Sequence, residues 1–279
     1  MAPASTTPSL RSIRVPERAA QTVLAALQRN KDVEYAEPDF EAQALGTAND
    51  PYYTGGNQWY LSKIQAPGAW DYSTGSSGVI VGIIDTGVLT SHPDLAGKVL
   101  AGYDFVNNDA DASDDNGHGT AAAGATSAAS NNLAGMASVA WGNPILPVKV
   151  LGADGSGTYS GIANGITWAA DKGARIINLS LGGTSSSRTL QDAVNYAWNK
   201  KAVLVAAAGN NGNDTALYPA ACSNVVAVSA TNSSDSRPSW SNYGSYVDVA
   251  APGESILTLY GADSYAYWNG TSFSSPVAS

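Results

Sequence analysis

Six short apolar segments along residues 78–253 constrain the fold of this chain more than any other feature. Their hydrophobicity is continuous rather than alternating, which is typical of strands covered on both faces of a parallel sheet. Residues 161–173 and 189–201 lie between them and have the apolar spacing of helices. Alternating strands and helices predict an α/β fold, a doubly wound parallel sheet with helices on both faces. The six segments are GVIVGIID (78–85), NPILPVKVL (143–151), ARIINLSLGG (174–183), KAVLVAAAGN (201–210), NVVAVSAT (224–231) and SYVDVAAPG (245–253).

The composition excludes several classes of partner. The 279 residues carry 14 basic and 23 acidic side chains, a net charge of −9, which is the opposite of the basic surface that binds nucleic acid. The apolar runs are far shorter than the roughly 20 residues that a membrane-spanning helix needs. The single cysteine, Cys222, cannot form an internal disulfide. We expect no nucleic-acid or membrane partner, and a monomeric chain.

Three of the apolar segments end in residues that could take part in binding or catalysis. Asp85 closes the first, Ser180–Gly183 close the third, and Asn210 closes the fourth. Because the carboxyl ends of parallel strands meet at one edge of the sheet, ligands bind there. A carboxylate, a glycine-rich edge and an amide donor are therefore expected to share one site.

Two further residues complete a set for nucleophilic catalysis. His118 precedes an alanine-rich helical stretch, and Ser272 follows Gly270 near the end of the sequence. A serine hydroxyl needs a general base before it can attack, and a histidine base needs a carboxylate to fix its tautomer. Asp85, His118 and Ser272 supply each role once, so the sequence predicts a serine nucleophile.

Five motifs in this order and spacing resemble the subtilisin-like serine peptidases (the subtilase family), and the thermitase group among them, from about Asn49 to Ser279. The resemblance implies that Ser272 is the nucleophile and that His118 is the general base and then the acid. It also implies that Asp85 orients the imidazole and that Asn210 stabilises the oxyanion together with the backbone N–H of Ser272. The motifs are DTGV (85–88), GHGT (117–120), SLGG (180–183), AAAGN (206–210) and GTSFSSP (270–276).

The same resemblance implies protein and peptide substrates held in an extended conformation. Two edge segments would sandwich the substrate, and a third set would form the pocket for the residue before the cleaved bond. An apolar pocket floor favours large apolar side chains there. The edge residues are Gly155, Ser156, Gly157, Ser180, Leu181 and Gly182; the pocket walls are Ala207, Ala208 and Gly209, and the floor is Leu217.

Calcium is the expected cofactor, in a structural role. Five oxygen-bearing side chains lie within residues 104–111, a density that suits a hard divalent cation. The resemblance gives Asp104, Asn107, Asp109 and Asp111 as ligands of one site. It implies a second site made of Asp50, Asp94 and Asn132 with the carbonyl groups of Ala129, Ala134 and Met136. The alternative is that residues 104–115 form a solvated acidic loop.

Charged residues are concentrated in residues 9–40, and residues 41–51 have the composition of a linker, which predicts a small N-terminal domain with its linker at 1–45 and a main domain at 46–279. Residues 9–15 and 32–40 are predicted strands around a helix at 16–29. This segment resembles the second half of a peptidase-inhibitor prodomain, which implies that the enzyme binds its own prodomain and cleaves the Leu45–Gly46 bond. We expect a secreted, extracellular enzyme whose signal peptide lies outside this sequence.

The end of the sequence leaves an alternative open. Seven residues follow Ser272, whereas the family continues through a long buried helix. We therefore expect a peptidase domain that is incomplete at its C-terminal end. The alternative function is a catalytically inactive fragment or pseudoprotease that acts as a calcium-bound binding module. A nucleotide-binding α/β protein is not favoured, because VGIIDTGV lacks the glycine-rich fingerprint.

Overall fold

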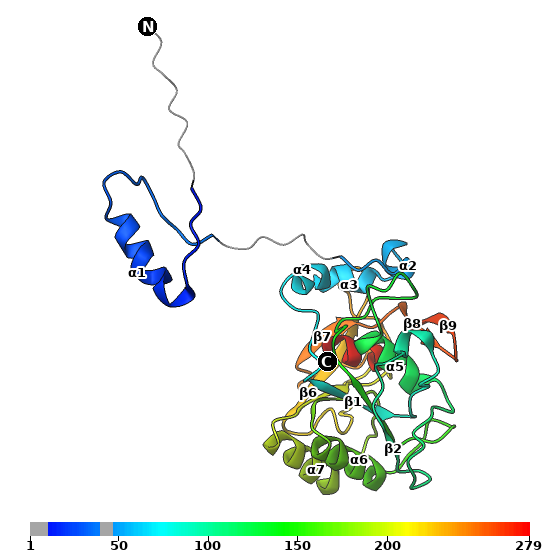
Figure 1. Ribbon diagram of the computed structural model, residues 1–279. Helices are drawn as coiled ribbons and strands as arrows, with labels where there is room; N and C mark the ends of the chain where they lie inside the picture. The colour runs from blue at the N-terminus through cyan, green and yellow to red at the C-terminus, as the bar shows by residue number, and fades with distance from the viewer. Residues whose placement is uncertain (1–10, 40–46) are drawn as a thin grey trace. The chain divides into compact units, whose positions relative to one another are not determined.

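The computed structural model describes residues 11–39 and 47–279 of the chain. The chain divides into two compact units, Met1–Leu45 and Gly46–Ser279, drawn in Figure 1. The first unit contains one helix, α1 (Glu17–Gln28), among its described residues. The prediction of a helix there is confirmed.

The two strands predicted beside α1 are wrong for the residues that the structure describes. Residues 11–16 and 31–39 form no strand. A strand is stable only when its backbone groups pair with a neighbouring strand. Val23, Leu24 and Leu27 on α1 are only half-buried, so this unit provides little apolar surface on which two strands could assemble.

The second unit is built on a parallel sheet of seven strands in the order β2-β3-β1-β4-β5-β6-β7 (Figure 1). All six strands expected from the apolar segments are present, which confirms the predicted α/β fold. β2, only two residues long, joins them at the edge beside β3. The strands are β1 (Ile80–Asp85), β2 (Tyr103–Asp104), β3 (Ile145–Lys149), β4 (Ala174–Leu179), β5 (Val203–Ala207), β6 (Val225–Thr231) and β7 (Val249–Pro252).

Helices cover both faces of this sheet, as predicted. On one face Ile162, Ile166 and Val194 of α6 and α7 pack on the strands. On the other face Ala121 of α5 and Val277 of α8 pack against Val205 and Val228. The helices are α2 (Pro51–Thr54), α3 (Trp59–Lys63), α4 (Ala66–Trp70), α5 (His118–Ser127), α6 (Tyr159–Asp171), α7 (Arg188–Asn199) and α8 (Thr271–Ala278), with a short 3-10 turn at Pro93–Leu95.

Local side chains set where the two large helices begin. The hydroxyl of Thr158 accepts a hydrogen bond from the backbone N–H of Gly161 and caps α6. Ser187 caps α7 in the same way through the N–H of Leu190. Such caps satisfy N–H groups that have no partner within the helix. Over the described parts of the chain, no helix is both long and apolar enough to cross a bilayer.

An antiparallel hairpin, β8 (Ile256–Tyr260) and β9 (Ser264–Trp268), precedes α8. It was not among the predicted elements. β1 lies between β3 and β4, so the chain winds away from β1 in both directions. This switch point is where open α/β sheets bind ligands, and Asp85 is the last residue of β1.

Candidate active site

Asp85 and His118 form a direct pair at the carboxyl end of β1. The Asp85 side chain is completely buried, and its Oδ1 lies 2.7 Å from Nδ1 of His118. The backbone N–H of Thr86 donates to the same oxygen at 2.8 Å. His118 is the first residue of α5. A β-carbon at Gly119 would collide with the carbonyl oxygen of Gly87, so glycine allows α5 to approach the end of β1 this closely.

The surroundings of His118 favour its protonated form. Burial by itself lowers the pKa of the imidazole, but the charge and hydrogen bond of Asp85, with the charge of Asp114, outweigh it and raise the pKa above its ordinary value. The Asp85 carboxylate therefore holds the ring through Nδ1 and favours the cationic form of the imidazole.

Ser272 lies in the first turn of α8, where it is hydrogen-bonded to Ser180 directly after β4. Its Oγ donates to the carbonyl oxygen of Ser180 at 3.3 Å, and the Ser180 hydroxyl donates back to the carbonyl of Ser272 at 2.7 Å. The ring of the next residue, Phe273, has its centroid 5.7 Å from that of His118. In this rotamer the Ser272 hydroxyl bonds to Ser180 rather than to the imidazole. Hydrogen bonds of catalytic groups often tighten only when substrate is present.

Asn210 follows β5 and is fixed through its oxygen. Its Oδ1 accepts hydrogen bonds from the backbone N–H and the hydroxyl of Thr271 at 2.8 and 2.9 Å. This leaves Nδ2 as a donor. The position of a β-carbon built on Gly270 lies 3.5 Å from Nδ2 of Asn210 and 3.6 Å from the backbone N of Ser272. Two N–H donors, Nδ2 of Asn210 and the backbone N–H of Ser272, therefore lie near one point beside Gly270.

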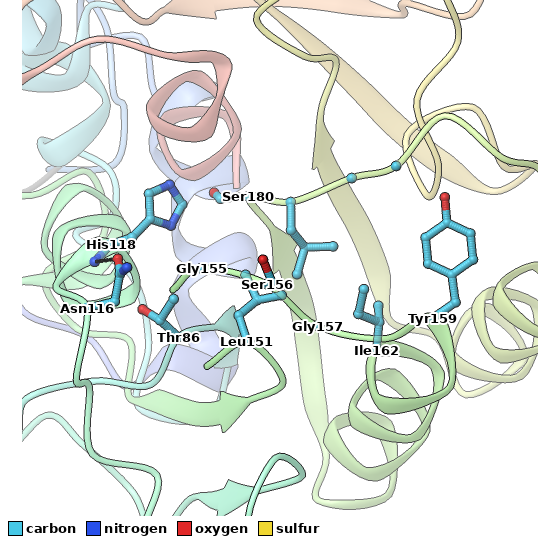
Figure 2. A pocket seen from close by; sticks show the side chains of 13 residues that line it. Thr86, Asn116, His118, Leu151, Gly155, Ser156, Gly157, Tyr159, Ile162 and Ser180 are labelled. Atoms are coloured by element: carbon cyan, nitrogen blue, oxygen red, sulfur yellow. Dashed lines mark hydrogen bonds between the residues drawn. The ribbon is translucent and has the colours of Figure 1, made fainter. Parts of the chain in front are cut away.

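A cavity of about 440 Å³ opens beside His118 (Figure 2). The two edge segments expected to hold substrate, Gly155–Gly157 and Ser180–Gly182, line it together. Because these segments come after β3 and β4, the groove follows the carboxyl edge of the sheet. The other lining residues are Thr86, Asn116, His118, Leu151, Tyr159, Ile162 and Gly183.

Ala207, Ala208, Gly209 and Leu217 were expected to form the pocket for the substrate residue that precedes the cleaved bond. They are not among the residues that line the cavity. Ala207 and Ala208 are buried at the end of β5. A β-carbon on Gly182 would lie 3.0 Å from Cδ2 of Leu217, and one on Gly209 would lie 3.1 Å from the same atom. The Leu217 side chain therefore packs between the two chain segments that flank Ser272.

The sequence profile of the subtilase family matches residues 76–279, a span that contains all of these groups. The chain belongs to the subtilase family. It is 54% identical over 230 residues to thermitase of Thermoactinomyces vulgaris, covering 82% of each chain. It is 50% identical over 256 residues to the thermophilic serine proteinase of Bacillus sp. (strain AK1), covering 92% of this chain and 64% of that protein.

A solved structure from Pseudoalteromonas arctica PAMC 21717, described as a protease, has a TM-score of 0.77 to this chain. The identity is 36%, and the match covers 83% of this chain and 84% of that one. The predicted family and fold are thereby confirmed. The chain spans slightly less than two thirds of the length of the Bacillus relative.

Sequence reasoning missed several groove residues of this subtilase. Tyr159 and Ile162 lie on the first turn of α6, and Leu151 lies just after β3. The predicted helix, residues 161–173, begins two residues after Tyr159, and although it includes Ile162, its apolar spacing does not indicate which side chains border a groove. The cap at Thr158 was the available signal, because it sets the start of α6 and with it the direction in which these side chains project.

The loop proposed for calcium satisfies its own side chains. Both oxygens of Asp104 accept hydrogen bonds from within residues 106–107. Asp109 and Asp111 are exposed, and each accepts a hydrogen bond from a backbone N–H two residues later. Within residues 11–39 and 47–279, no group of three or more His, Cys, Asp or Glu side chains is arranged to hold a metal. The arrangement of this loop alone therefore does not favour the set Asp104, Asn107, Asp109 and Asp111.

Asp50, Asp94 and Asn132 of the second calcium set are associated with one loop, although they are distant in sequence. Like the first set, they belong to no metal-holding group of three or more His, Cys, Asp or Glu side chains among the residues that the structure describes. The Asp50 carboxylate is buried and accepts from the backbone N–H groups of Asn131 and Asn132. The Asp94 carboxylate is also buried and accepts from the N–H of Met136 and the hydroxyl of Tyr265. Burial raises the pKa of Asp94, and the charge of Asp50 adds to this effect. Two buried carboxylates beside one loop suit a divalent cation.

The activity of this subtilase is expected to decline in acid with the titration of His118. A general base must be neutral, so kcat/KM falls as the pH drops through the pKa of the imidazole. Because Asp85 and Asp114 raise that pKa, the midpoint of the acid limb is expected above the ordinary value of about 6.5. The measurement is kcat/KM against pH with a neutral peptide substrate, and a midpoint below that value contradicts the prediction.

Proposed function

We propose that this chain hydrolyses peptide bonds in proteins as a serine endopeptidase, with Asp85, His118 and Ser272 as its triad. The observation that carries the proposal is the 2.7 Å contact between Asp85 and His118. His118 and Ser180 both line the groove, and Ser180 is hydrogen-bonded to Ser272. The three residues belong to β1, α5 and α8, and the contacts of Asp85 with His118 and of Ser272 with Ser180 support the assignment.

The first half of the reaction is acylation. Oγ of Ser272 bonds to the carbonyl carbon of the substrate while its proton passes to Nε2 of His118. The negative charge that develops on the carbonyl oxygen is stabilised by Nδ2 of Asn210 and the backbone N–H of Ser272. The carbon–nitrogen bond then breaks, and the leaving amine takes the proton from His118. An acyl group remains on Ser272.

The second half repeats these roles with water. His118 accepts a proton from a water molecule as its oxygen bonds to the acyl carbon. The ester bond to Ser272 breaks, and the proton returns from His118 to Oγ. Asp85 keeps its charge throughout and stabilises the imidazolium twice in each cycle.

We propose that large apolar residues before the cleaved bond are preferred. Leu217 packs against Gly182 and Gly209, and neither neighbour carries a charge that would select a basic side chain. In a peptide series that differs only at this position, Leu and Phe are expected to give kcat/KM values roughly tenfold or more above Lys and Asp. Mass spectrometry of a digested unfolded protein provides a second test, and cleavage mainly after charged residues contradicts the proposal.

The proposed enzyme is secreted, monomeric and made with a prodomain that it removes itself. The Leu45–Gly46 bond lies outside the described residues, but the division between the two compact units falls at this bond. A leucine before the bond also agrees with an apolar pocket. N-terminal sequencing of the active enzyme tests this processing, and a terminus other than Gly46 contradicts it.

We propose that calcium stabilises the fold through Asp50, Asp94 and Asn132, aided by the carbonyl groups of Ala129, Ala134 and Met136. The ion would neutralise two buried carboxylates that face one loop. At a calcium concentration 100 times the dissociation constant, binding contributes about 2.7 kcal/mol, so a chelator is expected to lower Tm by roughly 5–10 °C. Asp50→Asn should lower Tm and make it insensitive to the chelator, whereas Asp192→Asn, at an exposed site on α7, should retain the full response.

A further inference from the structure

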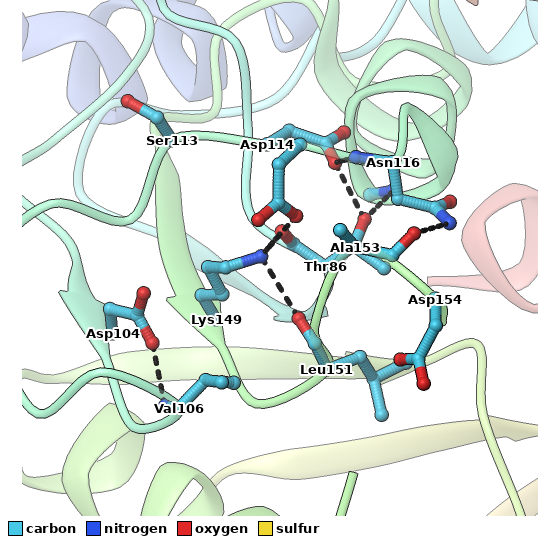
Figure 3. A network of polar contacts seen from close by, with 12 residues as sticks. Thr86, Asp104, Val106, Ser113, Asp114, Asn116, Lys149, Leu151, Ala153 and Asp154 are labelled. Carbon is cyan, nitrogen blue, oxygen red and sulfur yellow. Dashed lines mark hydrogen bonds and ion pairs between the residues drawn. The ribbon is translucent and has the colours of Figure 1, made fainter. Parts of the chain in front are cut away.

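A buried carboxylate that is not part of the triad lies beside it. Asp114 precedes α5 and is 7% exposed. Its Oδ1 accepts hydrogen bonds from the hydroxyl of Thr86 at 2.8 Å and from the backbone N–H of Gly117 at 2.8 Å. Its Oδ2 accepts from the backbone N–H and the hydroxyl of Thr120 at 2.9 and 2.6 Å. Figure 3 shows Asp114 and Thr86 within this polar network.

These contacts connect the two elements that hold the catalytic pair. Thr86 directly follows Asp85, whereas Gly117 directly precedes His118 and Thr120 lies in the first turn of α5. The Thr86 hydroxyl also accepts a hydrogen bond from the N–H of Gly119 at 2.9 Å. A displacement of β1 relative to α5 would therefore break several hydrogen bonds to one buried carboxylate.

The same end of β1 is held from the other side by Lys149 (Figure 3). Its Nζ is buried and donates to the carbonyl oxygens of Thr86 and Leu151 at 2.7 and 3.0 Å. It also pairs with Asp115 at 2.6 Å. Thr86 is thus fixed through its hydroxyl by Asp114 and through its carbonyl by Lys149, which leaves Asp85 little freedom to shift.

We propose that Asp114 is a positioning residue for the reaction, holding Asp85 and His118 at their bonding distance through Thr86 and Thr120. The inference rests on the proposed function, because it assigns a role within that catalytic site. Asp114 touches neither the substrate nor the reacting atoms. It acts by fixing the end of β1 against the start of α5, and by adding a second negative charge near the imidazole.

The charge of Asp114 is maintained despite its burial. Burial raises the pKa of this carboxyl, but the hydrogen bonds from Thr120, Gly117 and Thr86 outweigh that effect and lower it. Two charges raise the pKa of His118, those of Asp85 and Asp114. The nearby cation Lys149 is directed toward Asp115 and two carbonyl groups.

Substitutions at Thr86 test the geometric part of the proposal in the full chain. Thr86→Val removes the hydroxyl that joins the end of β1 to Asp114 and to the N–H of Gly119 on α5, but it leaves every charge in place. We expect kcat to fall roughly tenfold with KM within about twofold, because a small misplacement of catalytic groups acts on turnover. Thr86→Ser retains the hydroxyl and is expected to restore kcat to within about twofold of the parent chain.

Asp114→Asn tests the electrostatic part. It removes the charge, so kcat is expected to fall roughly 10- to 100-fold and the acid limb of kcat/KM to move to lower pH. The chain has only two histidines, so the NMR titration of the His118 ring can be followed directly and does not depend on activity. Its midpoint should move down in Asp114→Asn, remain in place in Thr86→Val, and remain in place in the exposed control Asp192→Asn.

The outcomes separate this inference from the proposed function. If the parent chain neither hydrolyses peptides nor reacts with a fluorophosphonate probe, the proposed function fails. If the parent chain is active but Thr86→Val keeps full kcat and Asp114→Asn leaves the His118 titration unmoved, the positioning role is wrong. A rise in KM without a loss of kcat would also overturn it. If Asp114→Asn does not fold, the comparison of kcat between Thr86→Val and Thr86→Ser decides whether the positioning role holds.

Discussion

Ser272→Ala is expected to lower kcat by roughly 10⁶-fold, a magnitude known for the corresponding loss in subtilisin, a member of the same family. Without Oγ no acyl-enzyme forms, and the imidazole has no hydroxyl to deprotonate. KM is expected to change little, because the groove along Gly155–Gly157 and Ser180–Gly182 is intact. The measurement is steady-state hydrolysis of a peptide substrate, combined with labelling by a fluorophosphonate.

The same helix provides a matched control. Ser274 lies two residues further along α8, and its buried hydroxyl has no hydrogen-bond partner among the described residues. Ser274→Ala is therefore expected to keep both activity and labelling. Covalent labelling that persists in Ser272→Ala would place the nucleophile elsewhere and refute the assigned triad.

Asn210→Ala is expected to lower kcat roughly 10²- to 10³-fold while KM stays within about threefold; this range comes from the corresponding asparagine of subtilisin. Thr271 anchors Oδ1 of Asn210, which leaves Nδ2 for a charge that exists only in the transition state. A donor of this kind contributes to turnover rather than to substrate affinity. Separate determination of kcat and KM is the test.

Asn211→Ala is the neighbouring control. Its side chain is exposed, and it has no role in the proposed reaction, so both constants are expected to stay near those of the parent chain. An Asn210→Ala variant that loses affinity but keeps its turnover would show that Asn210 binds substrate instead of stabilising the oxyanion.

The sheet could be predicted from the sequence because buried parallel strands leave a local signature. Continuous apolar segments such as 78–85 and 201–210 correspond to β1 and β5. β2 was not predicted because two residues carry no periodicity. The strands expected beside α1 show the opposite error: residues 11–15 have strand-like composition, but pairing depends on a partner that local sequence does not reveal.

The candidate site was predictable where one residue type in a motif indicates one chemical role. Asp85, His118, Ser272 and Asn210 are each indicated by motif and role, and the structure brings Asp85 and His118 into contact. Asp114 was overlooked because an aspartate in an acidic loop has the composition of a solvated or metal-binding segment. Only its burial and its bonds to Thr86 and Thr120 separate it from Asp109 and Asp111.

The starts of α5 and α8 carry His118 and Ser272, while the rest of α5 and all of α8 from Phe273 to Val277 are buried, with Ala121, Ala125 and Ser275 inaccessible to solvent. Protein engineers therefore face different constraints in different parts of this molecule. A larger side chain along α5 or α8 would shift a reacting group as well as fill space, so libraries for heat resistance are better directed at the face covered by α6 and α7. Libraries for altered selectivity belong on the groove residues 151–159 and 181–183, and they should leave out Ser180, which is hydrogen-bonded to Ser272 at the start of α8.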